Sequence, residues 1–130
     1  MSDERLHFEN RIKQARGHVN AARGGDKKAL ADALRALGNI ERRRPGFRED
    51  ANRTHTEAAA IYSELDLQLD EAWVIRHTGI NHEYAGRFDE AEMGLRECLR
   101  TLSQAFQNRR PRLRQRRPIG RRNKDGTRQN

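Results

Sequence analysis

The sequence carries an internal repeat, and this feature constrains the possible folds more than any other. Residues 33–41 align with residues 74–82, and the alignment places Gly38 and Gly79 in the same position of the two copies, 41 residues apart. A turn and an aromatic residue follow each copy, Phe47 in the first and Phe88 in the second. A repeat of this length is typical of supersecondary units that stack, since each unit buries its apolar face only against a neighbour.

The segment after each turn also repeats, as a small, large, small pattern of side chains. At spacings of four and three residues these positions share one face of a helix. The small residues let two helices approach closely, and the large residue fills the space between them. The three positions hold Ala51, His55 and Ala58 in the first copy and Ala91, Leu95 and Cys98 in the second.

Apolar residues recur at three- and four-residue spacing through residues 1–108, and no stretch shows sustained alternation. This spacing predicts an all-helical body. Asp26 is placed to cap the second helix, and Gly86 is placed to end the fourth. We expect helices at about residues 3–22, 28–43, 47–65, 69–85 and 89–107, with short connections that make neighbouring helices antiparallel.

The first halves of the two copies resemble the tetratricopeptide repeat, whose first helix carries a large apolar residue followed by leucine and glycine. Leu34, Leu37 and Gly38 occupy these positions in one copy, whereas Thr78 replaces the leucine before Gly79 in the other. The period of 41 residues is similar to the longer variants of the family, such as the kinesin-light-chain-like arrays. The family's aromatic position on the first helix holds Glu41 in one copy and His82 in the other.

The resemblance covers roughly residues 8–105, or about two and a half repeats. It implies an all-α fold for residues 1–108, in which antiparallel helix-turn-helix units form a short right-handed α-solenoid. It also implies a non-catalytic scaffold or adaptor that binds a peptide or partner protein on the concave face, which is made by the first helix of each pair. The candidate groove residues are Asp32, Arg35, Asn39, Arg42, Trp73, Arg76, His77, Ile80 and Tyr84.

Each of these candidates also has a purely structural interpretation. Arg35 and Asn39 occupy positions where some members of the family grip a terminal carboxylate, but Arg35 and Arg76 also fit solvated charges on a helix face. Trp73 is either a binding anchor or a core residue, because a lone Trp on an amphipathic helix serves in both ways.

The net charge of +8 comes entirely from the end of the chain. Residues 1–108 hold 17 Lys and Arg against 18 Asp and Glu, whereas residues 109–130 hold 10 against one. Because this second segment has only Leu113 and Ile119 as aliphatic residues, we expect it to be disordered. It supports an alternative function, binding of nucleic acid or another polyanion, through Arg109, Arg110, Arg112, Arg114, Arg116 and Arg117. A truncated sequence or an altered reading frame would give residues 109–130 the same kind of composition.

The sequence offers no pattern for catalysis or for a metal or cofactor. His77 and His82 are five residues apart and so lie on different helix faces, and Gly86 stands where a zinc-protease motif needs its second histidine. Cys98 occupies a small-residue packing position. With no apolar run long enough for a membrane and no secretory signal, we expect a cytoplasmic protein without enzymatic activity.

The number of repeats leads to a further expectation. Repeat arrays generally need three or more units and a polar capping helix, and neither is evident after Leu102. The sequence therefore predicts marginal stability or self-association through the last helix, by Leu95, Leu99, Leu102 and Phe106.

Overall fold

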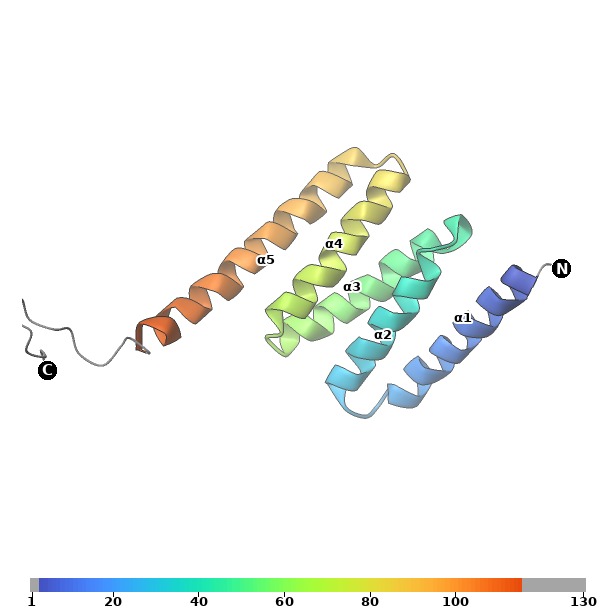
Figure 1. Ribbon diagram of the computed structural model, residues 1–130, viewed down its shortest axis with the longest axis horizontal. Helices are drawn as coiled ribbons and strands as arrows, with labels where there is room; N and C mark the ends of the chain where they lie inside the picture. The colour runs from blue at the N-terminus through green and yellow to red at the C-terminus, as the bar shows by residue number, and fades with distance from the viewer. Residues whose placement is uncertain (1–2, 116–130) are drawn as a thin grey trace, which may run out of the picture.

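The computed structural model describes residues 3–115, including the side chains of residues 3–108, and this part of the chain is built from helices. Each helix packs against the helices that precede and follow it, and successive helices run in opposite directions (Figure 1). The elements are α1 (Asp3–Ala22), α2 (Lys27–Glu41), the short 3₁₀ helix η1 (Pro45–Phe47), α3 (Arg48–Glu64), α4 (Gln68–Tyr84) and α5 (Phe88–Gln115). The predicted all-helical body is confirmed.

Two helix ends follow the chemistry expected of them. The side chain of Asp26 accepts a hydrogen bond from the backbone N–H of Ala29 at 3.0 Å, which satisfies one of the unpaired donors in the first turn of α2. Gly86 follows α4 with a φ of 78°, in the left-handed region that a glycine adopts without steric cost. These two residues fix the turns before α2 and before α5.

The last helix is longer than the sequence predicts. We expected it to end near residue 107 and expected disorder from residue 109, but α5 continues to Gln115. Residues 109–115 hold four arginines, which are good helix formers, although Pro111 lacks a backbone N–H to donate within the helix. The remainder of the predicted tail, residues 116–130, lies outside the described residues.

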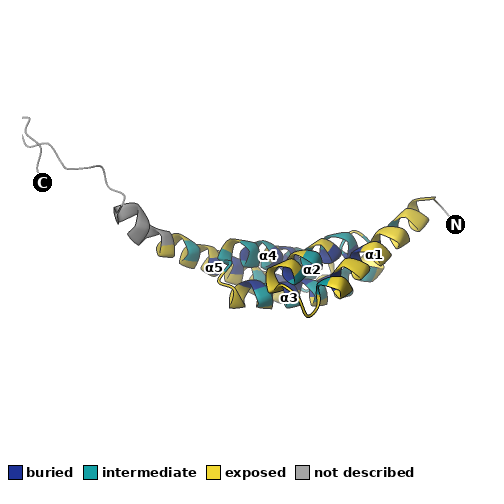
Figure 2. Cartoon of the chain, turned by 90° about the horizontal axis from the view of Figure 1, so that it is seen from below, coloured by how far each residue is buried: buried dark blue, intermediate teal, exposed yellow. Residues whose placement is uncertain are grey.

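The helices form two sides of one array. In Figure 2, α2 and α4 lie on the upper side and α3 lies below them, while α1 and α5 form the two ends. The core between them is small. Its buried apolar residues are Ile12, Ala15 and Val19 of α1, Ala31, Leu34 and Leu37 of α2, Ala58 and Tyr62 of α3, and Val74 of α4.

The repeat seen in the sequence is also a repeat of contacts. A Cβ atom placed on Gly38 of α2 would lie 2.3 Å from Cδ2 of His55 on α3. A Cβ atom on Gly79 of α4 would lie 3.6 Å from Cγ of Leu95 on α5. The glycine of each first helix therefore meets the large residue of the following helix, and the first contact is much tighter.

The small positions that flank the large residue are buried as the pattern predicts. Ala51 and Ala58 are buried on α3, and Ala91 and Cys98 are buried on α5. The thiol of Cys98 donates to the backbone carbonyl of Ala72 on α4 at 3.4 Å, and burial raises its pKa. This thiol therefore has the packing role that its position indicates.

The two glycine contacts predict different costs for the same substitution. Gly38→Ala should reduce the free energy of unfolding by about 1–3 kcal/mol, because the rigid His55 ring leaves no room for a methyl group. Gly79→Ala should change it by less than about 1 kcal/mol, because the contacts are ordinary and alanine favours the helix. Urea denaturation of both variants measures the difference, and equal effects would contradict the packing described here.

Candidate functional site

The nine groove candidates lie on α2 and α4, the two helices on the upper side of the array (Figure 2). Asp32, Arg35, Asn39 and Arg42 come from α2. Trp73, Arg76, His77, Ile80 and Tyr84 come from α4. The structure therefore brings the candidates from the two copies onto neighbouring helices.

At the centre of this face, Arg35 joins α2 to α4. Its guanidinium lies over the ring of Trp73, with Cζ 3.9 Å from the ring centroid, and one of its N–H groups donates to Asp70 at 2.9 Å. The indole is partly buried and packs against the core, so neither of the two interpretations of Trp73 describes it fully. Arg35 is thus held by a cation–π contact and an ion pair, and a carboxylate ligand would have to compete with Asp70.

Two buried histidines lie beneath the same surface. The ring of His77 packs against Trp73 with centroids 4.0 Å apart, and His55 of α3 contacts both rings at 6.2 Å. Burial lowers the pKa of His77 to about 4, helped by the charges of Arg42, Arg76 and Arg35. Burial also lowers the pKa of His55 to about 4, with further contributions from His77, Arg42 and Arg35. Both imidazoles are therefore neutral near pH 7.

Several buried polar atoms on this face lack a hydrogen-bond partner among the described residues. They are Oδ1 of Asn39, Nε of Arg42 and Nδ1 of His77. Buried polar atoms in folded proteins are nearly always paired with protein, water or ligand, because an unpaired one is costly. Unpaired acceptors and donors therefore lie just beneath this face.

The remaining candidates differ in how available they are. The carboxylate of Asp32 accepts hydrogen bonds from the Tyr62 hydroxyl at 2.6 Å and from Lys28 at 2.9 Å. Although burial acts to raise the pKa of Asp32, these two hydrogen bonds lower it below its usual value. Asp32 therefore links α2 to α3 through its hydrogen bond with Tyr62. By contrast, the side chains of Arg76 and Tyr84 are exposed.

Three residues that shape this face were not among the candidates predicted for it: His55, Asp70 and Arg48. The guanidinium of Arg48, at the start of α3, lies 4.5 Å from the ring centroid of Tyr84. The unusually large His55 at a helix-packing position could have been singled out, because its counterpart in the second copy is Leu95. Nothing local in the sequence marks Asp70 or Arg48.

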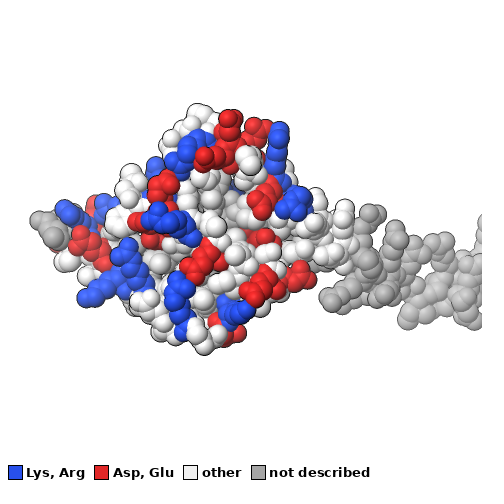
Figure 3. Space-filling view, turned by 180° about the vertical axis from the view of Figure 1, so that it is seen from behind, with Lys and Arg blue, Asp and Glu red and all other residues white. Residues whose placement is uncertain are grey.

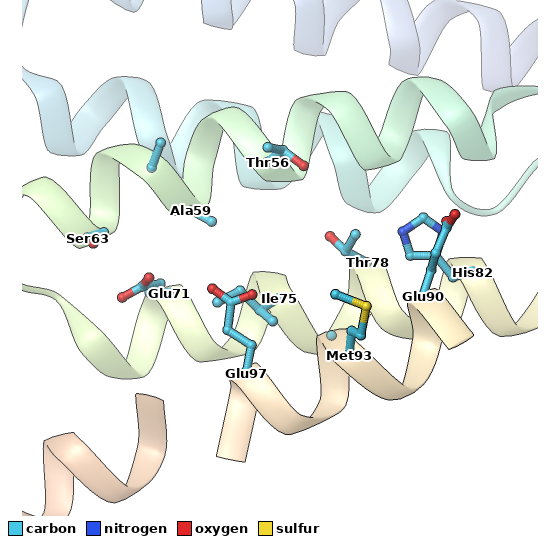
Figure 4. Close-up of a pocket in the computed structure, with 12 residues that line it drawn as sticks. Thr56, Ala59, Ser63, Glu71, Ile75, Thr78, His82, Glu90, Met93 and Glu97 are labelled. Carbon is cyan, nitrogen blue, oxygen red and sulfur yellow. The ribbon is translucent and has the colours of Figure 1, made fainter. Parts of the chain in front are cut away.

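A hollow lies on the other side of α4 from the candidate residues, between α3 and α5 (Figure 4). It has a volume of about 510 Å³ and carries Ile75, Met93 and three glutamates, without a Lys or Arg in its lining. Burial raises the pKa of Glu71, and the nearby Glu97 raises it further. The lining residues are Thr56, Ala59, Ala60, Ser63, Glu71, Ile75, Thr78, His82, Glu90, Met93, Gly94 and Glu97.

Elsewhere the surface charge is mixed. Figure 3 shows acidic and basic side chains interspersed over the face seen from behind. Of the arginines proposed for polyanion binding, Arg109, Arg110, Arg112 and Arg114 belong to the last turns of α5, and Arg116 and Arg117 lie outside the described residues.

Within residues 3–115, no group of three or more His, Cys, Asp or Glu side chains is arranged to hold a metal ion. In the same range, no helix is both long enough and apolar enough to cross a membrane. Comparison with known proteins gives no match to a family model, to a curated protein or to a solved structure.

The buried histidines predict a pH dependence of stability. The unfolded chain binds protons as the pH falls below 6.5, whereas folded His55 and His77 resist protonation until about pH 4. The free energy of unfolding should therefore decline as the pH falls from 6.5 to about 4. The charged groups that face the pair are Arg35 and Arg42 on α2 and Arg76 on α4.

The variant His55→Leu, which copies Leu95 of the second repeat, should flatten this decline because one of the two contributions is removed. Urea denaturation at a series of pH values between 4 and 7 measures the slope. Replacing the exposed His18 by Gln is the matched control and should leave the slope unchanged. A slope in His55→Leu equal to that of the parent chain would show that His55 does not resist protonation.

Proposed function

We propose that this chain is a non-catalytic protein-binding module that holds a segment of a partner protein along the face formed by α2 and α4. One observation carries the proposal: buried polar atoms of Asn39, Arg42 and His77, side chains of α2 and α4, have no partner among the described residues. A polypeptide supplies both N–H and C=O groups, and it can satisfy acceptors and donors together.

The charges on this face favour an acidic segment. The positive charges of Arg42 and Arg76 each lower the pKa of the buried His77, so both guanidinium groups lie near this residue. The only ion pair recorded for a candidate arginine on the face joins Arg35 to Asp70. A carboxylate of the partner would gain charge-assisted hydrogen bonds from the other two guanidinium groups.

Aromatic side chains supply the apolar part of the proposed surface. The Tyr84 ring is exposed beside Arg48, and it borders a hollow of about 400 Å³ lined by Ile80, Glu83, Tyr84 and Phe88. Aromatic anchors of this kind often contribute a large share of binding energy at protein interfaces. We therefore expect an acidic segment that carries an apolar side chain.

The α-solenoid and the role as a scaffold or adaptor belong to the same proposal. The alternation of helices between two sides of the array supports them, as does the recurrent contact between a glycine and the following helix. Polyanion binding by the arginines after residue 108 and a cytoplasmic location both stay predictions from the sequence.

Selection of binding peptides tests the proposal. A phage library of random dodecapeptides is panned on the full chain, and synthetic copies of the selected peptides are titrated while the fluorescence of Trp73, the single tryptophan, is followed. We expect selected peptides to be rich in Asp and Glu. Arg42→Ala and Arg76→Ala should each raise the Kd about fivefold to thirtyfold.

Arg53→Ala on α3 is the matched control, because this exposed arginine lies away from the α2 and α4 face. It should leave the Kd unchanged. Peptides that bind all three variants with the same affinity, or that show no excess of acidic residues, would overturn the proposal.

A further inference from the structure

The last helix carries an exposed apolar strip. Leu95, Leu99, Leu102 and Phe106 have exposed fractions of 40%, 65%, 38% and 65%. They are spaced by four, three and four residues, which places them on one side of the helix. The strip borders the side that contacts α4, where the buried residues are Ala91, Cys98 and Thr101, and Leu95 also packs against Gly79 of α4.

The repeat shows that this strip is a surface for packing another helix. One period earlier, α3 uses the corresponding side to hold α4: Asn52 accepts a hydrogen bond from Asn81 at 3.0 Å, and His55 contacts Trp73. The residues of α5 that match Asn52 and His55 are Glu92 and Leu95. Among the described residues no helix follows α5 to cover them, although Leu95 also packs against Gly79 of α4.

The four-and-three spacing of the strip continues in both directions along the sequence of α5, as a seven-residue pattern. Its eight positions, from residue 88 to residue 113, are spaced alternately by four and three residues, which is typical of two helices that pack along their length. In order, they hold Phe88, Glu92, Leu95, Leu99, Leu102, Phe106, Arg109 and Leu113.

These positions become complementary when the order is reversed. In an antiparallel pair centred between residues 100 and 101, Leu99 faces Leu102 of the other helix and Leu95 faces Phe106. Glu92 then faces Arg109, so opposite charges meet. In a parallel pair, Glu92 would face Glu92 and Arg109 would face Arg109.

The charges on the rest of α5 favour the same arrangement. Residues 88–98 hold four acids and one arginine, whereas residues 99–115 hold five arginines and no acid. Antiparallel pairing of two identical helices places the acidic half of each against the basic half of the other. A single helix is thus complementary to a second copy of itself.

We propose that two copies of this chain associate through α5, antiparallel, with residue 99 of each copy against residue 102 of the other. The interface is isologous, since the same surface serves both copies. Head-to-tail association would place the strip against α1, whose exposed side chains are polar or charged apart from Leu6 and Ala21. The contact shares one residue with the proposed binding surface, Phe88, which lines the hollow beside Tyr84.

Sedimentation velocity of the full chain over a range of concentrations tests whether a dimer forms. The double variant Leu99→Glu/Leu102→Glu should be monomeric while its circular dichroism stays helical. Met93→Glu is the matched control, because Met93 is 68% exposed on α5 but lies in the hollow beside α3. It should leave the dimer intact.

Cysteine pairs test the orientation. In a Cys98→Ala background, a Leu95→Cys chain mixed with a Phe106→Cys chain should form an intermolecular disulfide under mild oxidation. Leu95→Cys alone should not, because the two copies of residue 95 would lie roughly 16 Å apart along the helix axis, beyond the reach of a disulfide. Non-reducing electrophoresis with differently tagged chains identifies the product.

Charge exchange tests the pairing itself. Glu92→Arg and Arg109→Glu should each weaken the dimer about threefold to tenfold, and the double variant should restore its Kd. A chain that stays monomeric at high concentration would overturn the proposal. A disulfide formed by Leu95→Cys alone, or a double variant that is weaker than both single variants, would overturn the antiparallel pairing.

Discussion

The imidazole of His55 packs directly against the backbone of α2 at Gly38, and the arrangement of the central helices depends on this contact. The missing side chain at Gly38 lets α3 approach α2 closely enough for the ring to be completely buried. From there the ring also reaches Trp73 and His77, so a single side chain of α3 contacts both α2 and α4. Because the His55 ring is buried there, its surroundings disfavour the charged form of the imidazole.

Because these three rings meet under the surface of α2 and α4, the same packing that joins the helices shapes the proposed binding face. Arg35 covers the indole and is held by Asp70, while Arg42 and Arg76 bring positive charge near His77. The opposite face of α4 has the reverse character, with glutamates around an apolar floor. One helix therefore contributes to two surfaces of opposite charge.

Local sequence predicted the helices well because their ends depend on nearby residues such as Asp26 and Gly86. The period also predicted which helices correspond and which small residues are buried. Contacts between distant residues were not predictable in this way: Arg35 and Asp70 are 35 residues apart, and neither has a local signal for the other. Glu41 is a similar case, because it is buried and accepts a hydrogen bond from Thr54 of the next helix. The end of α5 was missed because the scarcity of aliphatic residues after residue 108 was interpreted as disorder, although arginine is a good helix former.

The packing of each helix mainly on its sequence neighbours makes stability a local property of the array. The cluster of buried apolar residues draws on α1 to α4 and includes no residue of α5. The terminal helices of an isolated copy would therefore open before its centre, and backbone amides in α5 would exchange with solvent through fluctuations that leave α2 and α3 folded. Order along the chain is graded, firmer at the centre than in the helix that carries the exposed apolar strip.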